Sequence, residues 1–236
     1  MADRPIIFSA GMIHALLDGR KSQTRRLLKL AGRRPDYIGP KGCTGDPACW
    51  GWDNGDGGYI LADRDPSDKF AASWRDFAAS YAPGDRLWVR EAHAMVPATA
   101  YRMSDGVVQT VNPEDSDCAC LYRTGFDRST SGLRWRPSIH MPRWSSRLTL
   151  IVTDVRIQRV QDISEADAQA EGLVEVYEGW ATDREGRHWG PDARASYRVL
   201  WNDLHGEDAW ERNDWVAALT FTVHRQNIDQ MEPTND

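Results

Sequence analysis

Three stretches of the chain repeat their apolar residues at the spacing of an α-helix. The first begins at Ser9, a residue type that caps helix N-termini, and Gly19 is placed to end it. The second begins at Ser164 in a sequence that resembles a capping box. The third covers about 195–204. The apolar positions of these helices are Met12, Ile13, Leu16 and Leu17, then Ile163, Ala166, Ala170 and Leu173, then Tyr197, Leu200, Trp201 and Leu204.

Apolar runs typical of β-strands occur at 86–91, 147–160 and 215–223. The strand at 86–91 alternates apolar and polar residues after the turn Pro83-Gly84-Asp85, and the run at 147–160 is the strongest strand pattern in the chain. Several strands that are far apart in sequence, together with a few helices, predict an α+β fold. We expect a closed or partly closed β-barrel with two or three helices at its rim.

The segments between these elements are polar and irregular. Three long insertions are expected, at about 35–80, 97–132 and 175–196, and the first of them has one short helix around Phe70–Tyr81. We expect residues 1–224 to form a single domain and residues 225–236 to form a disordered tail.

Composition places the chain among polar globular proteins. It has 236 residues, 41% of them hydrophobic, and its tryptophans (11) outnumber its tyrosines (7) and its phenylalanines (5). Nothing resembles a signal peptide, and no apolar run approaches the thickness of a bilayer, so we expect a cytoplasmic protein. In that compartment Cys43, Cys49, Cys118 and Cys120 are expected to stay reduced. They are either free thiols in loops or four ligands of a zinc ion at unusual spacing.

Positive charge is concentrated in two segments. The net charge is -6, which argues against non-specific coating of duplex DNA. Yet 20–34 and 128–153 contain seven Lys/Arg and five Arg respectively, and neither segment contains an acid. Each could be a solvated basic face, and together they favour a phosphate or nucleic-acid partner. The sequence contains no metallohydrolase motif, P-loop, dinucleotide fingerprint or nucleophile elbow.

Four blocks of the chain resemble a known family, in the order in which that family has them. Residues 17–26 (LDGRKSQTRR) resemble the G-x-K-x-x-T-x-R signature that opens ASCH domains, and 83–89 (PGDRLWV) resemble the family's G-D-x-L-x-V turn and strand. Residues 163–173 resemble its helix, which ends in a Glu, and 215–223 resemble its last strand. The three insertions and the Trp- and Arg-rich block 134–147 resemble longer ASCH proteins of phages and prophages. The resemblance implies a PUA-like barrel that binds a nucleotide or RNA.

One branch of this family removes the acetyl group from N4-acetylcytidine with a Lys, a Thr and a Glu. The matching positions here imply Lys21 as general base, Thr24 as nucleophile and Glu171 as proton donor, with no cofactor. The flanking arginines disfavour the ammonium form of Lys21, and the negative end of a helix dipole suits Glu171 as an acid. Lys21 and Thr24 can meet only if a turn or bulge follows Gly19. This chain departs from that branch in its length and in having Ser22-Gln23 within the signature.

Basic and aromatic side chains are the candidates for contacts to a substrate or a nucleic acid. Arg20 and Arg26 flank the signature, and the block 134–147 interleaves Arg and Trp around two prolines. Rigid rings beside guanidinium groups suit single-stranded nucleic acid, so Arg136, His140, Arg143 and Trp144 are further candidates. The block is equally compatible with a Trp-anchored loop packed on the barrel.

Three functions remain open at this point. The first is an amidohydrolase that acts on an N-acylated nucleoside or base. The second is a non-catalytic module that binds a modified base or a single strand. The third is a virion-assembly or interaction protein that uses the barrel as a scaffold. The Lys–Thr–Glu set favours the first, while the basic Trp-rich block and the long insertions favour the second.

Overall fold

A computed structural model describes residues 1–236 except 29–35, 38–49, 54–58, 62–80, 130–131 and 232–236. The described residues form a mixed α+β structure with three α-helices and thirteen mostly short strands, which confirms the predicted class. None of the helices in this part of the chain is long and apolar enough to cross a membrane.

The chain divides into two compact units. Unit 1 contains residues 1–22, 84–152 and 221–236, and unit 2 contains 23–83 and 153–220. The division falls within two long strands, β10 (Thr149–Arg159) and β13 (Trp215–His224).

The larger sheet has the strand order β1-β6-β10-β13-β2. In unit 1, β1 (Asp3–Ile7) runs parallel to β6 (Arg86–Arg90), and the start of β10 runs antiparallel to β6. In unit 2, β2 (Gln23–Leu27) runs antiparallel to β13. Within the described residues no pairing joins the outer strands β1 and β2, so this sheet is not shown to close into a barrel.

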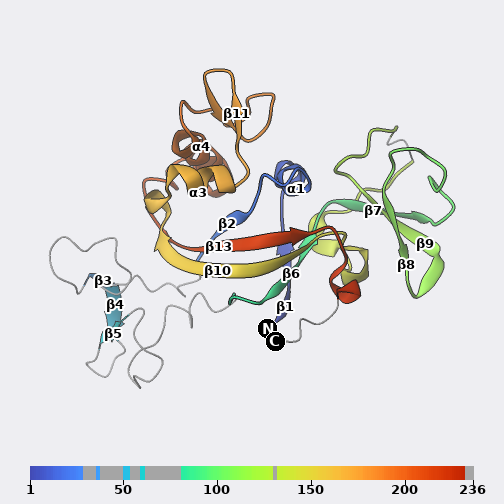
Figure 1. Ribbon diagram of the computed structural model, residues 1–236, viewed down its shortest axis with the longest axis horizontal. Helices are drawn as coiled ribbons and strands as arrows, with labels where there is room; N and C mark the ends of the chain where they lie inside the picture. The colour runs from blue at the N-terminus through green and yellow to red at the C-terminus, as the bar shows by residue number, and fades with distance from the viewer. Residues whose placement is uncertain (29–35, 38–49, 54–58, 62–80, 130–131, 232–236) are drawn as a thin grey trace. The chain divides into compact units, whose positions relative to one another are not determined.

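Helix α1 (Ala10–Leu17) of unit 1 begins and ends as the sequence predicts. The helix is labelled in Figure 1. Ser9 is its N-cap residue, and Ile13 and Leu16 are buried in the core. Gly19 has φ +74°, a backbone conformation that glycine adopts without steric cost. The amides of Arg20 and Lys21 both donate to the carbonyl of Ala15, at 2.9 and 3.1 Å. The chain therefore turns sharply before Lys21, as the signature requires.

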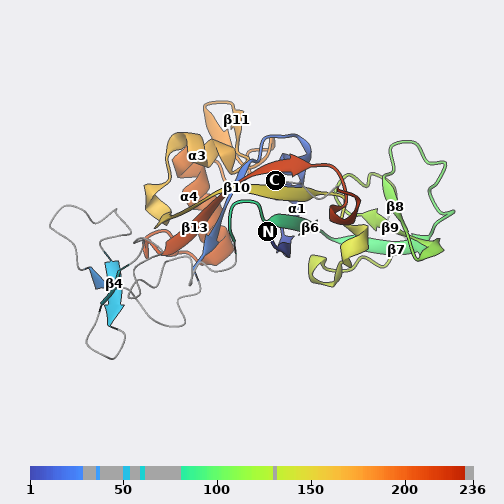
Figure 2. The same ribbon diagram turned by 60° about the horizontal axis from the view of Figure 1, so that its bottom comes forward.

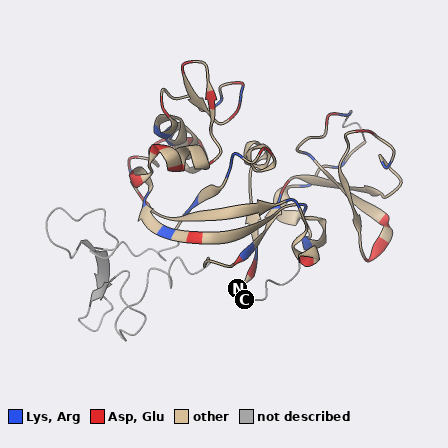
Figure 3. Cartoon of the chain, in the orientation of Figure 1, with Lys and Arg blue, Asp and Glu red and all other residues tan. Residues whose placement is uncertain are grey.

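The segment 97–132 is not the irregular insertion that we expected. It contains β8 (Gln109–Asn112) and β9 (Asp115–Tyr122), which form a three-stranded sheet with β7 (His93–Pro97) in the order β7-β9-β8 (Figure 2). The first three residues of β9 are exposed, whereas 119–122 are buried on both faces, so the strand has no simple alternation. Exposed acids gather at the turn between β8 and β9, red in Figure 3: Glu114, Asp115 and Asp117.

Unit 2 contains α3 (Glu165–Ala170) and α4 (Ala193–His205), both close to their predicted positions. The expected insertion at 175–196 instead contains most of a hairpin, β11 (Val174–Val176) and β12 (Gly179–Ala181), and the start of α4. The strands are three residues long, too short for a recognisable sequence pattern. A further small sheet, of β3 (Asp36–Tyr37), β4 (Trp50–Asp53) and β5 (Tyr59–Leu61), lies in the expected insertion at 35–80. The helix predicted at Phe70–Tyr81 lies almost wholly outside the described residues.

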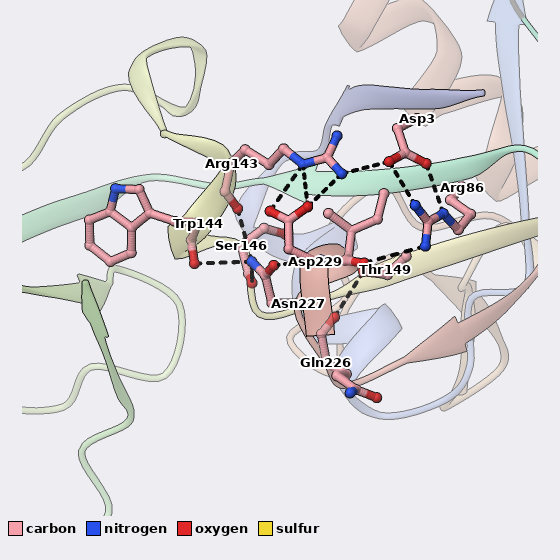
Figure 4. Close-up of polar contacts among 10 residues, drawn as sticks. Asp3, Arg86, Arg143, Trp144, Ser146, Thr149, Gln226, Asn227 and Asp229 are labelled. Atoms are coloured by element: carbon pink, nitrogen blue, oxygen red, sulfur yellow. Dashed lines mark hydrogen bonds and ion pairs between the residues drawn. The ribbon is translucent and has the colours of Figure 1, made fainter. Parts of the chain in front are cut away.

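The predicted disordered tail is wrong for residues 225–231, which are packed into unit 1. A short 3-10 helix covers Ile228–Gln230, and Ile228 is fully buried. The side-chain amide of Asn227 donates to the carbonyls of Arg143, Trp144 and Ser146 at 2.8–3.0 Å (Figure 4). These partners are about 80 residues away in sequence, so a local sequence pattern does not reveal the order of this segment.

Candidate active site

Strand β2 of unit 2 carries three consecutive polar side chains that are buried: Gln23, Thr24 and Arg25. The strand pairs Arg25 with Ala218 and Thr24 with Leu219 of β13. Because side chains alternate along a strand, Gln23 and Arg25 lie on the same face of the sheet. A small residue opposite Arg25 leaves room beside its long side chain. The face is therefore built to hold polar groups away from water.

Helix α3 supplies the carboxylates that meet this face. Ser164 caps the helix, its hydroxyl accepting from the amide of Asp167 at 3.1 Å. Asp167 and Glu171, four residues apart, lie on the same side of the helix, and Glu171 is its C-cap residue. The side-chain amide of Gln23 donates to Asp167 at 3.0 Å. The cap residue, the four-residue spacing and the alternation of β2 together bring the two elements' polar groups into contact.

Arg25 is the centre of this polar cluster. Its guanidinium donates to Gln23 at 2.7 Å, to Glu171 at 3.0 Å and to Asp167 at 3.1 Å. The side chains of Arg25 and Glu171 are 0% and 2% exposed, so this ion pair is shielded from solvent. A second arginine, Arg156, donates to Asp167 from the solvent side. Two guanidiniums thus face two carboxylates, and the formal charges of these four groups cancel.

Arginine side chains surround both carboxyl groups. Burial on its own would raise the pKa of Asp167, but hydrogen bonds from Arg156 and Gln23 outweigh it and hold that pKa below its usual value. For Glu171, the helix-end position that the sequence predicted is confirmed. The guanidinium of Arg25 lies 3.0 Å from the Glu171 carboxyl group, and the two side chains form a buried pair. The sequence argument, which considered only the helix dipole, did not include this partner.

The other two predicted catalytic residues are also buried. Thr24 is 3% exposed on β2 in unit 2, and Lys21 is 0% exposed in unit 1. In unit 1 the Nζ atom of Lys21 lies 5.6 Å from the centroid of the Phe8 ring. A lysine is almost never fully buried without a partner or a role. Lys21 is assigned to unit 1, and Thr24 and Glu171 to unit 2, so each is described within its own unit.

The two arginines predicted beside the signature differ in environment. The Arg20 guanidinium donates to Asp18 at 3.0 and 3.2 Å and is partly exposed. Arg26 is half-buried, and burial lowers its pKa, opposed mainly by the nearby Tyr81 and Glu171. Tyr197 of α4 is buried, which raises the pKa of its phenol well above the usual value. Arg20 is thus paired with a surface carboxylate, whereas Arg26 lies near the buried polar groups of unit 2.

The Arg- and Trp-rich block separates into exposed and built-in residues in unit 1. Arg136 and His140 are exposed. Arg143 donates to Asp3 at 2.5 Å and to Asp229 at 2.6 Å, and these contacts raise its pKa further (Figure 4). Trp144 packs against the buried cluster of Cys120, Tyr122 and Met141. Arg143 and Trp144 therefore have structural partners within unit 1.

A further arginine of this block, Arg147, forms a buried ion pair that the sequence did not indicate. It donates to both oxygens of Glu91, at 2.8 and 2.9 Å, and its guanidinium lies 4.1 Å from the centre of the Tyr122 ring. Burial raises the pKa of Glu91, although the hydrogen bonds from Arg147 oppose this. Part of the block is therefore packed into unit 1 and is not a solvent-exposed basic surface.

Two of the four cysteines lie outside the described residues, namely Cys43 and Cys49. Cys118 and Cys120 are free thiols on β9, and burial raises the pKa of Cys120 to about 12. Within the described part of the chain, no three His, Cys, Asp or Glu side chains are grouped so that they could hold a metal ion. A zinc site made by all four cysteines stays a prediction.

Comparison with known proteins adds no family. No protein-family model, no curated protein and no solved structure matches this chain.

Proposed function

We propose that the chain is an ASCH-type, PUA-like amidohydrolase that removes an acyl group from an N-acylated nucleoside or base of the N4-acetylcytidine kind. The observation that supports this best is the burial of all three residues of the resembled catalytic set. Lys21, Thr24 and Glu171 are at most 5% exposed. Most lysines and glutamates of proteins are exposed to solvent, so burial of both residue types at the resembled positions is unusual.

The proposed reaction is an acyl transfer in two halves. Lys21 takes the proton of the Thr24 hydroxyl, and the oxygen attacks the acyl carbon. The C–N bond breaks, and the departing amine of the base leaves with a proton delivered through Glu171. Water then adds to the acyl–Thr24 ester, the carboxylic acid is released, and the Thr24 hydroxyl is restored. In this scheme the proton taken from Thr24 passes from Lys21 to Glu171, and Glu171 then donates it to the departing amine.

The alternative function is non-catalytic binding of a modified base or a single strand. Exposed Arg136 and His140 suit it. The ion pairs of Arg143 and Arg147 weigh against it, since a guanidinium that already binds carboxylates is less available for phosphates.

A turnover screen of the full chain against N4-acylated cytidines and other N-acyl nucleosides tests the proposal. We expect release of the parent nucleoside, with Lys21→Ala and Thr24→Ala slower by at least about a hundredfold, the usual contribution of a base that assists a nucleophile. Thr153→Ala, at an exposed threonine of unit 2, is the matched control and keeps full activity. No turnover, together with salt-sensitive binding of a modified oligonucleotide, would support the binding function instead.

A further inference from the structure

Unit 2 contains a second group of side chains arranged for nucleophilic chemistry, away from the resembled signature. The Oγ1 of Thr182 lies 2.9 Å from Nδ1 of His188, and Nε2 of His188 lies 3.2 Å from a carboxylate oxygen of Asp203. We call these three side chains the Thr182 relay. A hydroxyl, an imidazole and a carboxylate in hydrogen-bonded series form the arrangement by which proteins activate an alcohol.

The hydrogen-bond donors of the relay follow from its carboxylate. An ionised carboxylate only accepts, so the proton on the neutral imidazole lies on Nε2 and points to Asp203. Nδ1 then has a lone pair that faces Thr182, and the hydroxyl donates to it. This is the tautomer in which His188 acts as a base towards Thr182. The same hydroxyl lies 3.1 Å from the carbonyl of Arg187, a longer and weaker alternative acceptor.

The backbone conformation of His188 is an unfavourable one for a residue with a side chain. His188 has φ +54°, a left-handed conformation that is uncommon for residues other than glycine. Its carbonyl accepts from the Ser196 hydroxyl at 2.7 Å, and a Cβ on Gly190 would lie only 2.3 Å from the Ser196 amide. The segment after His188 is therefore held closely against α4, which carries Asp203.

Closure of the loop does not require the imidazole contacts. The amide of Thr182 donates to the Arg187 carbonyl at 2.9 Å, and the amide of Arg187 donates to the Asp183 carboxylate at 2.9 Å. These two bonds already join the ends of the loop between Thr182 and Arg187. The His188 side chain is 15% exposed and Asp203 is 66% exposed, so the relay lies near solvent, where a substrate can approach.

We propose that Thr182 is a second nucleophile, activated by His188 and oriented through Asp203, which accepts acyl groups from activated esters. In the step, the Thr182 proton passes to Nδ1 of His188 and the Thr182 oxygen forms a bond to the acyl carbon. The bond from that carbon to the leaving alcohol breaks, and the alcohol departs as its anion or with the proton from His188. This site is separate from Thr24 and does not depend on the function proposed above.

The test uses p-nitrophenyl acetate as the probe on the full chain carrying Thr24→Val, which removes the other proposed nucleophile. We expect p-nitrophenolate release and an acetyl group that peptide mapping by mass spectrometry locates on Thr182. Thr182→Val should abolish that label, and His188→Gln should slow labelling at least about a hundredfold. Thr153→Val, at an exposed threonine of the same unit, should label like the parent.

Asp203→Asn separates the relay from a folding effect, because Asp203 is largely exposed and its replacement leaves the core untouched. We expect this variant to keep its circular dichroism spectrum and to label more slowly than the parent. Labelling confined to lysines, or an unchanged rate on Thr182 in both His188→Gln and Asp203→Asn, would overturn the proposal.

Discussion

Arg25 belongs to a strongly basic segment of the sequence, yet its guanidinium is buried against two carboxylates. The family resemblance pointed to Lys21, Thr24 and Glu171. It did not indicate that Arg25 would pair with Glu171, nor that Gln23 and Asp167 would contact Arg25. The alternation of side chains along β2 and the four-residue spacing in α3 would predict these contacts, but only if it were already known that the two elements pack against each other. Pairing between distant elements is what a single sequence does not contain.

Replacing Arg25 should destabilise the protein strongly. Arg25→Met leaves Glu171 buried without its guanidinium partner, and removal of one partner of a buried pair costs about 3–5 kcal/mol. Arg156→Met is the matched control, because it removes the partly exposed arginine of the same cluster and should cost about 0–1 kcal/mol. Urea denaturation of both variants measures the difference, and equal losses would show that burial of the Arg25 pair does not matter.

The elements that the sequence predicted best have local signals at their ends. Ser9 and Gly19 bound α1, Ser164 caps α3, and β10 and β13 are long apolar runs. The sheet β7-β9-β8 and the hairpin β11–β12 were missed, since one lacks a two-residue alternation and the other has strands of three residues. The C-terminal segment was missed because long-range contacts order it. Local patterns thus predicted the elements with caps and long runs, and not those that depend on tertiary partners.

The ion pairs of β1 give unit 1 a predictable response to acid. Asp3 binds Arg86 at 2.8 Å and Arg143 at 2.5 Å, and hydrogen bonding to Arg86 is the largest cause that lowers its pKa from 3.8, against the effect of burial. Because the pKa of Asp3 is lower in the folded state than in the unfolded state, its ionised form stabilises the fold at any pH above the unfolded-state pKa. This stabilisation disappears as the pH falls through the folded-state pKa.

Asp3→Asn should therefore lower the thermal midpoint at pH 7, and the difference should shrink as the pH falls through the lowered folded-state pKa of Asp3. The expected loss at pH 7 is about 1 kcal/mol, because Asp3 is partly exposed. Asp154→Asn, at an exposed aspartate, serves as the control. A difference that grows as the pH falls would contradict the assignment.

For the whole molecule, the pairing of individual arginines discriminates between a hydrolase and a nucleic-acid-binding module better than the net charge of -6 does. Arg143 and Arg147 are held in ion pairs inside unit 1, and Arg25 and Arg156 are paired in unit 2. This leaves fewer arginines for a phosphate backbone than the sequence suggested. A small N-acylated nucleoside, which needs few phosphate contacts, therefore agrees with the arrangement of these arginines better than a long strand does.

The most direct test of the hydrolase is to trap the acyl group on the enzyme. Mixing the full chain with N4-acetylcytidine, quenching in acid and mapping the peptides should show an acetyl ester on Thr24 that forms before cytidine release reaches its steady rate. Lys21→Ala should prevent its formation, and Glu171→Gln should slow it. Cytidine release without any label on Thr24, or with undiminished activity in Thr24→Val, would contradict the account.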